Sequence, residues 1–185
     1  IIPKNDEFFS EYSFPNRLKY ISNFSGSAGM AIILKNKNFL FVDGRYTEQA
    51  SIESGKNFKI FEIPNIRPFN IFKKRQDKLK LGFDPKLFTE TRLKSNFRDS
   101  CNLIPISNNL IDEIYNFKNV KSKEFYCLSE TVVGEKITSK LKKLSSILKK
   151  KKIQNIFISA PENCAWLLNI RGFDNPNSPI PNCQI

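Results

Sequence analysis

Two short apolar runs early in the chain predict a hairpin of buried strands. Residues 30–34 and residues 39–42 are continuously apolar, and the polar residues 35–38 join them. Apolar runs of this length on either side of a polar turn are typical of adjacent antiparallel strands. Asp43-Gly44 interrupts the second run, so we expect the second strand to end there.

Helix and strand patterns alternate after this hairpin. Residues 46–54 contain good helix formers, with Gly55 where a helix should end, and residues 58–63 alternate as a strand that Pro64 ends. The alternation continues with a helix between Pro68 and Asp77, a strand over residues 79–83, a helix capped by Thr89 that runs to about Arg98, and a strand over residues 103–106. Such alternation predicts an α/β domain with a mixed sheet.

A lysine-rich stretch without an apolar pattern, residues 116–124, is typical of a linker. We therefore place a first domain at residues 1–117 and the beginning of a second at residues 118–185. The second domain opens with a helix on which four apolar residues recur at helical spacing, namely Ile137, Leu141, Leu144 and Leu148. This spacing predicts one buried face between solvated lysines.

The remainder of the second domain shows few elements. Residues 153–158 are typical of a strand, Pro161 suits the first turn of a short helix, and Gly172 should close that helix. Residues 174–179 have the composition of a loop. Because so few elements cannot bury a core alone, we expect this domain to be incomplete. The chain also lacks an initiator Met, which we interpret as truncation at the N-terminus.

Composition narrows the classes of function. With 185 residues of which 40% are hydrophobic, the chain should be globular. No apolar run approaches the roughly 20 residues that span a bilayer, and the first residues lack the features of a signal peptide. The four cysteines are far apart and form no CxxC pair, which indicates reduced thiols in the cytoplasm rather than disulfides or a zinc site.

The net charge of +12 raises the hypothesis of a nucleic-acid partner, because lysines bind phosphates. Lys, Asn, Ile and Phe are all abundant, however, as expected where base composition favours A and T codons. The sequence also lacks a recognisable nucleic-acid module. We therefore expect a solvated lysine-rich surface and no nucleic-acid partner.

The stretch Ser25–Gly29 resembles a nucleophile elbow only superficially. An elbow needs Gly-x-Ser-x-Gly between a strand and a helix, whereas here the first position is Ser25 and the next element is a strand. The chain contains no histidine that could act as the base. We expect the glycines to allow a tight turn with φ > 0 and close backbone packing.

Arg45 is a second candidate, since a guanidinium offers five donors in a fixed geometry that suits carbonyls and carboxylates. From the residues alone, the simpler interpretation is a structural ion pair with a nearby carboxylate. The acidic residues are scattered at turns and caps, and histidine is absent, so we predict no metal site and no catalytic residue within this chain.

Several short motifs together resemble one family, the long-form Xaa-Pro aminopeptidases (aminopeptidase P) of the creatinase and prolidase superfamily. In chain order the motifs are Ile1-Ile2-Pro3 with Asp6, Ser10-Glu11-Tyr12, Arg17-Leu18, Phe24-Ser25-Gly26-Ser27-Ala28-Gly29, Asp43-Gly44-Arg45-Tyr46 with Gln49-Ala50, Gly82-Phe83-Asp84-Pro85, Asn109-Leu110-Ile111-Asp112, and Ala165-Trp166-Leu167-Leu168-Asn169-Ile170-Arg171-Gly172 with Asp174. They occur in the family's order and cover nearly the whole chain.

The resemblance implies two N-terminal α/β domains of similar fold followed by a catalytic domain that is absent here. That absent domain would bind two divalent metal ions, usually manganese, through two Asp, one His and two Glu. It would release the N-terminal residue from Xaa-Pro peptides, and the protein would be a cytoplasmic homodimer. The resemblance also implies that Arg45 contacts the bound peptide and that Arg171 and Asp174 shape the domain interface without being catalytic.

Two other hypotheses stay open at this point. Relatives that have lost the metal ligands act as chaperones or scaffolds, so the chain would then belong to a non-catalytic binding module. A nucleic-acid binder is the third hypothesis, and it rests only on the charge.

Overall fold

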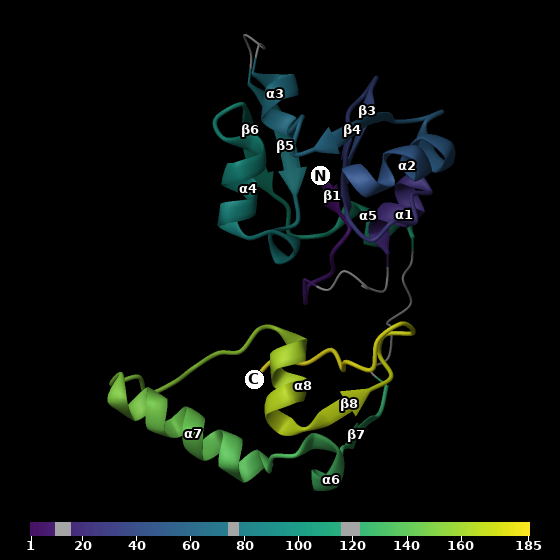
Figure 1. Cartoon of the computed structure of the whole chain (residues 1–185). Coiled ribbons are helices and arrows are strands. Elements are labelled where there is room, and N and C mark those ends of the chain that lie inside the picture. The colour runs from purple at the N-terminus through teal and green to yellow at the C-terminus, as the bar shows by residue number, and fades with distance from the viewer. Residues whose placement is uncertain (10–15, 74–77, 116–122) are drawn as a thin grey trace. The chain divides into compact units, whose positions relative to one another are not determined.

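The structure is a computed structural model that describes residues 1–9, 16–73, 78–115 and 123–185 (Figure 1). The chain divides into two units by its internal contacts, unit 1 (Ile1–Lys118) and unit 2 (Asn119–Ile185), and each is described by itself. Unit 1 contains β1 (Ile2–Pro3), α1 (Arg17–Ser22), β2 (Gly29–Ile33), β3 (Asn38–Asp43), η1 (Gly44–Tyr46), α2 (Thr47–Ser54), β4 (Lys59–Ile63), α3 (Pro68–Phe72), β5 (Leu79–Phe83), η2 (Pro85–Leu87), α4 (Glu90–Phe97), β6 (Cys101–Pro105) and α5 (Leu110–Ile114).

The main sheet of unit 1 has four strands in the order β1-β2-β3-β4. β2 and β3 form the predicted antiparallel hairpin, with Met30 opposite Phe41 in the register. β4 pairs with β3 in parallel, and α2 makes the connection between them. The α/β class and the mixed sheet are therefore confirmed, as is the end of α2 before Gly55.

A second, two-stranded sheet pairs β5 and β6 in parallel, with α4 between them in the chain. β5 has the predicted bounds, and the Thr89 hydroxyl accepts a hydrogen bond from the Arg92 backbone N–H at 3.2 Å, as expected of a cap. β6 begins earlier than predicted, because Cys101 is buried in the core and belongs to the strand. The prediction of a helix after Pro68 is confirmed by α3, although residues 74–77 lie outside the described residues.

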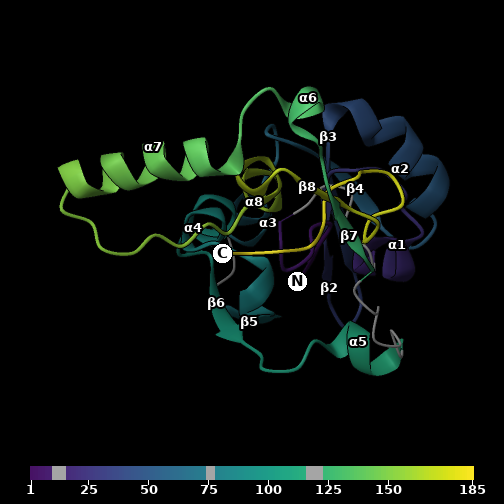
Figure 2. The ribbon, with the colours of Figure 1, turned by 90° about the horizontal axis from the view of Figure 1, so that it is seen from below.

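β3 separates two hydrophobic cores. Phe39 and Phe41 face the first core, which also contains side chains of α3, β5, α4 and β6. Leu40 and Val42 face the second core, together with side chains of α1 and α2. Figures 1 and 2 show the same arrangement, with α1 and α2 on one side of the four-stranded sheet and β5, β6, α3 and α4 on the other.

The glycine-rich turn before β2 is structural. A Cβ on Gly26 would lie 2.2 Å from the ring carbon Cζ of Phe24, a side chain with no exposed area. The expected close packing is therefore confirmed. The expected φ > 0 is wrong, because neither Gly26 nor Gly29 has a positive φ; the turn needs glycine for space and not for a left-handed backbone.

Unit 2 has the elements β7 (Phe125–Cys127), α6 (Glu130–Val133), α7 (Ile137–Lys150), α8 (Pro161–Leu168) and β8 (Ile170–Gly172). β7 and β8 form a two-stranded antiparallel sheet. Pro161 occupies the first turn of α8 as predicted. None of the described helices is long and apolar enough to cross a membrane.

Two sequence predictions for unit 2 are wrong. Residues 153–158 form no strand: Ile158 exchanges backbone hydrogen bonds of 2.6 and 3.1 Å with Ile185, whereas the Ile153 N–H donates back to the Leu148 carbonyl of α7 at 2.9 Å. α8 ends at Leu168 rather than near Gly172, because Asn169 adopts the left-handed conformation that ends helices. Gly172 instead pairs with Phe125 in the small sheet.

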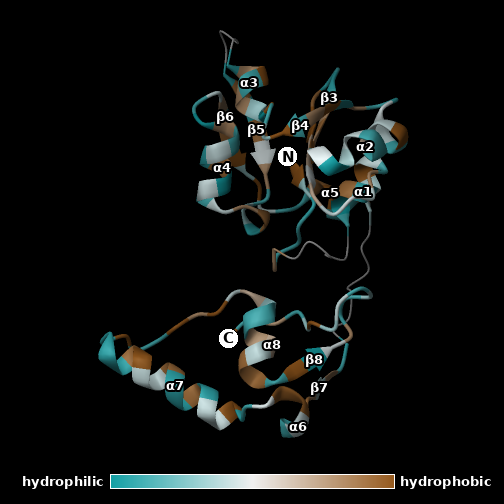
Figure 3. Cartoon of the chain, in the orientation of Figure 1, coloured by the Kyte–Doolittle hydropathy of each residue, from teal (hydrophilic) through white to brown (hydrophobic). Residues whose placement is uncertain are grey.

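The predicted helix over residues 137–148 is confirmed as α7, but its predicted burial is wrong. Leu141 is 42% exposed, and the buried residue of α7 is Lys140. The Lys140 ammonium donates to the Trp166 carbonyl and to Asn169 Oδ1, both at 2.6 Å, and lies 4.2 Å from the centre of the Trp166 ring. Because these acceptors stand at the carboxyl end of α8, the cation lies where the helix dipole favours positive charge. Figure 3 shows the alternating hydropathy along α7.

We expect Gly26→Ala to destabilise unit 1, because its new methyl group would overlap the Phe24 ring. Overpacking of this kind costs about 1–3 kcal/mol. The measurement is urea unfolding followed by far-UV circular dichroism. The matched control is Gly82→Ala, whose Cβ would lie 3.4 Å from Ile106 in ordinary contact. Equal stability of the two variants would show that the Phe24 contact does not limit this turn.

We expect Lys140→Met to destabilise unit 2 by about 1–3 kcal/mol, because the buried Asn169 Oδ1 and the Trp166 carbonyl each lose a hydrogen bond while an apolar stem is retained. Trp166 is the chain's single tryptophan, so its fluorescence reports urea unfolding of this unit. Lys142→Met is the matched control, since Lys142 is exposed on the same helix. A loss of stability no larger than that of Lys142→Met would contradict the structural role of Lys140.

Candidate functional site

The Asp-Gly-Arg-Tyr motif lies at the carboxyl end of β3, where the chain turns into η1. Asp43 Oδ1 accepts hydrogen bonds from the Arg45 backbone N–H at 3.0 Å and from Arg45 Nε at 2.8 Å. The Arg45 side chain is 73% exposed and that of Asp43 is 43% exposed. The expected ion pair is therefore confirmed, and it fixes the orientation of the exposed Arg45 side chain at the end of β3.

The geometry of this turn affects the charge on Asp43. The side-chain hydrogen bond from Arg45, and after it the backbone hydrogen bond from the same residue, hold the pKa of Asp43 below its usual range. Gly44 contributes space, since a Cβ there would lie 3.0 Å from Glu62 Oε1 on β4. The turn therefore keeps a carboxylate ionised directly beside the arginine that it orients.

The serines of the glycine-rich turn are held in structural hydrogen bonds. The Ser25 hydroxyl donates to Glu53 Oε1 at 2.7 Å and accepts from Gln49 Nε2 at 2.7 Å. Ser27 Oγ lies 2.8 Å from the hydroxyl of Tyr46. These bonds tie the turn to α2 and η1, which supports the structural interpretation over a nucleophile.

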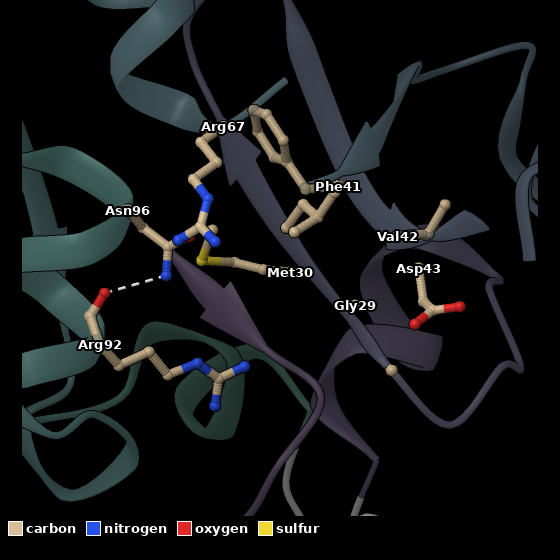
Figure 4. Close-up of a pocket in the computed structure, with 10 residues that line it drawn as sticks. Gly29, Met30, Phe41, Val42, Asp43, Arg67, Arg92 and Asn96 are labelled. Carbon is tan, nitrogen blue, oxygen red and sulfur yellow. Dashed lines mark hydrogen bonds between the residues drawn. The ribbon is translucent and has the colours of Figure 1, made fainter. Parts of the chain in front are cut away.

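A cavity of about 290 Å³ lies beside this corner of unit 1 (Figure 4). Asp43 and Ile63 reach it from the carboxyl ends of β3 and β4, Arg67 reaches it from the N-cap of α3, and Arg92 and Asn96 reach it from α4. The remaining lining residues belong to β3 and to β2 with the residue before it: Ala28, Gly29, Met30, Phe41 and Val42. In α/β folds, the carboxyl ends of strands are a common place for ligands.

Sequence reasoning missed Arg67, Arg92 and Asn96. The signal that could have indicated Arg92 and Asn96 is on α4, where they are four residues apart and Asn96 directly precedes the buried Phe97. Asn96 is itself buried, and its amide donates to the Arg92 carbonyl at 2.9 Å. Arg67 lies at the N-cap of α3, and its position in the cavity follows only from the fold.

Arg171 and Asp174 belong to unit 2, so the structure does not place them in one unit with Arg45. Asp174 is buried, and its two oxygens accept backbone hydrogen bonds from Lys123 at 2.7 Å and from Asn182 at 2.8 Å. Arg171 lies on β8, and its Nη1 donates to the Ile170 carbonyl at 2.8 Å. Asp174 therefore holds together the chain before β7 and the loop after β8.

No group of three or more His, Cys, Asp and Glu side chains stands close enough to hold a metal ion in the described ranges. All four cysteines, Cys101, Cys127, Cys164 and Cys183, are free thiols. Burial is the main reason why the pKa of Cys183 is raised to about 11, with nearby Cys164 and Asp174 adding to the shift. A thiol in this state is not an activated nucleophile.

Comparisons with known proteins relate both units to one family. Two family models described as Creatinase/Prolidase N-terminal domain match residues 12–114 and residues 116–184. "Probable Xaa-Pro aminopeptidase P" of Pyricularia oryzae is 32% identical over 194 residues, and that of Fusarium vanettenii is 31% identical over 194 residues. Each alignment covers 97% of this chain and 31% of the relative.

The structure is also similar to a solved one. An X-prolyl aminopeptidase from Caenorhabditis elegans, described as a cytosolic enzyme with a di-nuclear active site, is 28% identical with a TM-score of 0.84. The match covers 97% of this chain and 31% of that protein. The chain thus spans about 31% of the length of the relatives that it matches.

We expect Arg45→Gln to raise the pKa of Asp43 towards its ordinary value of 3.8, because the side-chain hydrogen bond from Arg45 is the largest cause of the lowering. The return should be partial, since the backbone N–H of residue 45 still donates. With its pKa depressed, the Asp43 carboxylate keeps the pair intact at neutral pH, and the pair is lost as pH falls through that pKa. Carbon-13 NMR titration of the Asp43 carboxyl measures this. Arg171→Gln is the control, and an Asp43 pKa that is equal in the two variants would exclude the Arg45 contact in solution.

Proposed function

We propose that this chain, which belongs to the Creatinase/Prolidase N-terminal domain family, is the N-terminal part of an Xaa-Pro aminopeptidase. Such an enzyme removes the N-terminal residue from peptides whose second residue is proline. The observation that carries the proposal is the match over 97% of this chain to the C. elegans X-prolyl aminopeptidase, with a TM-score of 0.84. The relatives from P. oryzae and F. vanettenii have the same activity in their names.

The proposed division of labour assigns the chemistry to a domain outside this chain. We propose residues 1–117 as domain I and residues 118–185 as the beginning of domain II. The two metal ions, which we propose to be manganese, would be bound downstream, because the described residues offer no donor set for them. When bound, such metals activate water and stabilise the developing negative charge during peptide hydrolysis.

Arg45 is the residue through which this chain would contact the peptide. Its guanidinium is exposed, and Asp43 fixes its Nε, so that little side-chain freedom is lost when a ligand binds. A charged donor suits a peptide carbonyl or a terminal carboxylate. Arg45 would therefore bind and orient the peptide while taking no part in bond cleavage.

Two further expectations extend this proposal. Arg171 and Asp174 would shape the interface between domains. The hydrogen bonds that Asp174 accepts from the backbone of Lys123 and Asn182 support this role, because they hold the local backbone in place. The whole protein would be a homodimer. It would be cytoplasmic, which the cytosolic location of the C. elegans relative supports.

A hydrolysis assay separates this proposal from a non-catalytic scaffold. The whole protein that contains this chain should release the first residue from an Xaa-Pro peptide, lose that activity with a chelator and regain it with Mn²⁺. The 185-residue chain alone should be inactive. A whole protein that binds the peptide without cleaving it, with or without added metal, would support the scaffold and overturn the peptidase.

We expect Arg45→Ala in the whole protein to raise KM for an Xaa-Pro peptide by about tenfold or more while kcat changes little. The reason is that a contact made equally in the bound substrate and in the transition state affects binding alone. Lys37→Ala is the matched control, because Lys37 is an exposed cation in the turn at the opposite end of β3. Kinetic constants that equal those of Lys37→Ala would remove the role proposed for Arg45.

A further inference from the structure

The cavity beside Asp43 is lined by more positive charge than negative charge. Arg67 and Arg92 both line it, and Asp43 supplies the carboxylate among the lining residues. Asp43 is already paired with Arg45, with Nε 2.8 Å from Oδ1. Two guanidinium groups therefore line the same cavity, and the lining carboxylate, that of Asp43, is paired with Arg45 instead of with either of them.

Arg92 is a half-buried positive charge at this cavity. One of its Nη atoms donates to Asn5 Oδ1, a neutral oxygen, and its guanidinium lies 5.8 Å from the centre of the Phe88 ring. In the part of the chain that the structure describes, Arg92 belongs to none of the ion pairs. Burial lowers the pKa of Arg92, because the charge has lost water without gaining an anion.

Arg17 in the same unit shows how the fold treats an arginine that serves only structure. Its side chain is 6% exposed, and it donates to Asp112 at 2.6 Å and to Glu7 at 2.8 Å. Burial acts to lower its pKa, but the hydrogen bonds and charges of the two carboxylates together raise it. Unit 1 thus gives one buried arginine two anions and leaves Arg92 facing a cavity.

Arg67 approaches the same space from the N-cap of α3. Its contact with the protein is weak, since Nη1 lies 3.4 Å from the Ser95 carbonyl, and it too belongs to none of the ion pairs of the described residues. Figure 4 shows the Arg67 side chain extending to Met30, whereas the Arg92 side chain extends from α4 below Met30. The two guanidinium groups can therefore approach one ligand from two sides.

The apolar walls of the cavity increase the electrostatic attraction between its two arginines and an anion. Met30, Phe41 and Ile63 are apolar lining residues, and a low-dielectric wall increases the attraction between an arginine and an anion. A volume of about 290 Å³ is at the lower end of the range for ligand pockets, about 300–1,000 Å³, so the ligand should be small.

We propose that this cavity binds a small organic anion, whose carboxylate or phosphate group is held between Arg67 and Arg92 and whose carbon skeleton lies against Met30, Phe41 and Ile63. Guanidinium groups bind these oxyanions through paired, charge-assisted hydrogen bonds. The ligand would supply the negative charge that the lining residues lack. The proposal does not depend on the peptidase activity, because it uses neither Arg45 nor the metal ions proposed for the rest of the protein.

The test is a titration of the isotope-labelled 185-residue chain, followed by nitrogen-15 NMR at constant ionic strength. The probes are butyrate, inorganic phosphate and, as the neutral analogue of the first, butyramide. We expect butyrate or phosphate to shift the amide signals of Gly29 and Asn96 saturably, whereas butyramide should not. A response to butyrate alone identifies a carboxylate site, and a response to phosphate alone identifies a phosphate site.

Three variants make the result specific. Arg67→Gln and Arg92→Gln should each weaken binding by about tenfold or more, the effect of losing one charge-assisted contact. Lys94→Gln, on the same α4 but outside the cavity, should leave the affinity within about twofold, as expected of an exposed charge. Circular dichroism shows whether each variant is folded. If Arg92→Gln unfolds, Arg67→Gln still decides, because Arg67 has only a weak contact with the protein. Absence of saturable shifts, or equal affinities of Arg67→Gln and Lys94→Gln, would overturn the proposal.

Discussion

The central constraint on unit 1 is that β3 is buried on both faces while it pairs on both edges. Phe39 and Phe41 enter one core and Leu40 and Val42 the other, and β2 and β4 occupy the two edges. A shift of one residue in the register would exchange the two sets of side chains between cores of different shape. The end of β3 is therefore fixed in space, and so is the position of Asp43, from which Arg45 is oriented.

Much of this arrangement could be predicted from the sequence, because its signals are local. The hairpin, β5 and the Thr89 cap follow from short apolar runs and from single residues with well-known turn and cap preferences. Errors occurred where a partner decides the outcome. Residues 153–158 have the composition of a strand, but a strand also needs a neighbouring strand; Ile158 pairs with Ile185, while Ile153 bonds back to Leu148 of α7. Similarly, Asn169 ends α8 before Gly172, since asparagine also tolerates the left-handed conformation.

The candidate site also contains one part that local sequence patterns predict and one part that they do not. Arg45 stands in a contiguous motif after a strand, so both its pairing with Asp43 and its place at the end of the sheet could be anticipated. Arg67 and Arg92 are far apart in the sequence, and no periodicity relates α3 to α4. Only the packing of both helices into the core that contains Phe41 brings the two arginines to one cavity. Sites assembled from separate helices are thus beyond what local patterns can predict.

Three partly or fully buried cations show how differently this chain compensates positive charge. Arg17 has two carboxylates, and Lys140 has two oxygens at the carboxyl end of α8, where the helix dipole favours a cation. Arg92 has a single neutral oxygen from Asn5 and an aromatic ring. Burying a charge is costly unless it is paired. The protein itself compensates the charges of Arg17 and Lys140, but its described residues supply no anion for Arg92. Arg92 differs from the other two in lining a cavity, where solvent or a ligand takes the place of a protein anion. An overall charge of +12 therefore says little about binding, whereas the partners of each buried cation indicate where an anion would bind.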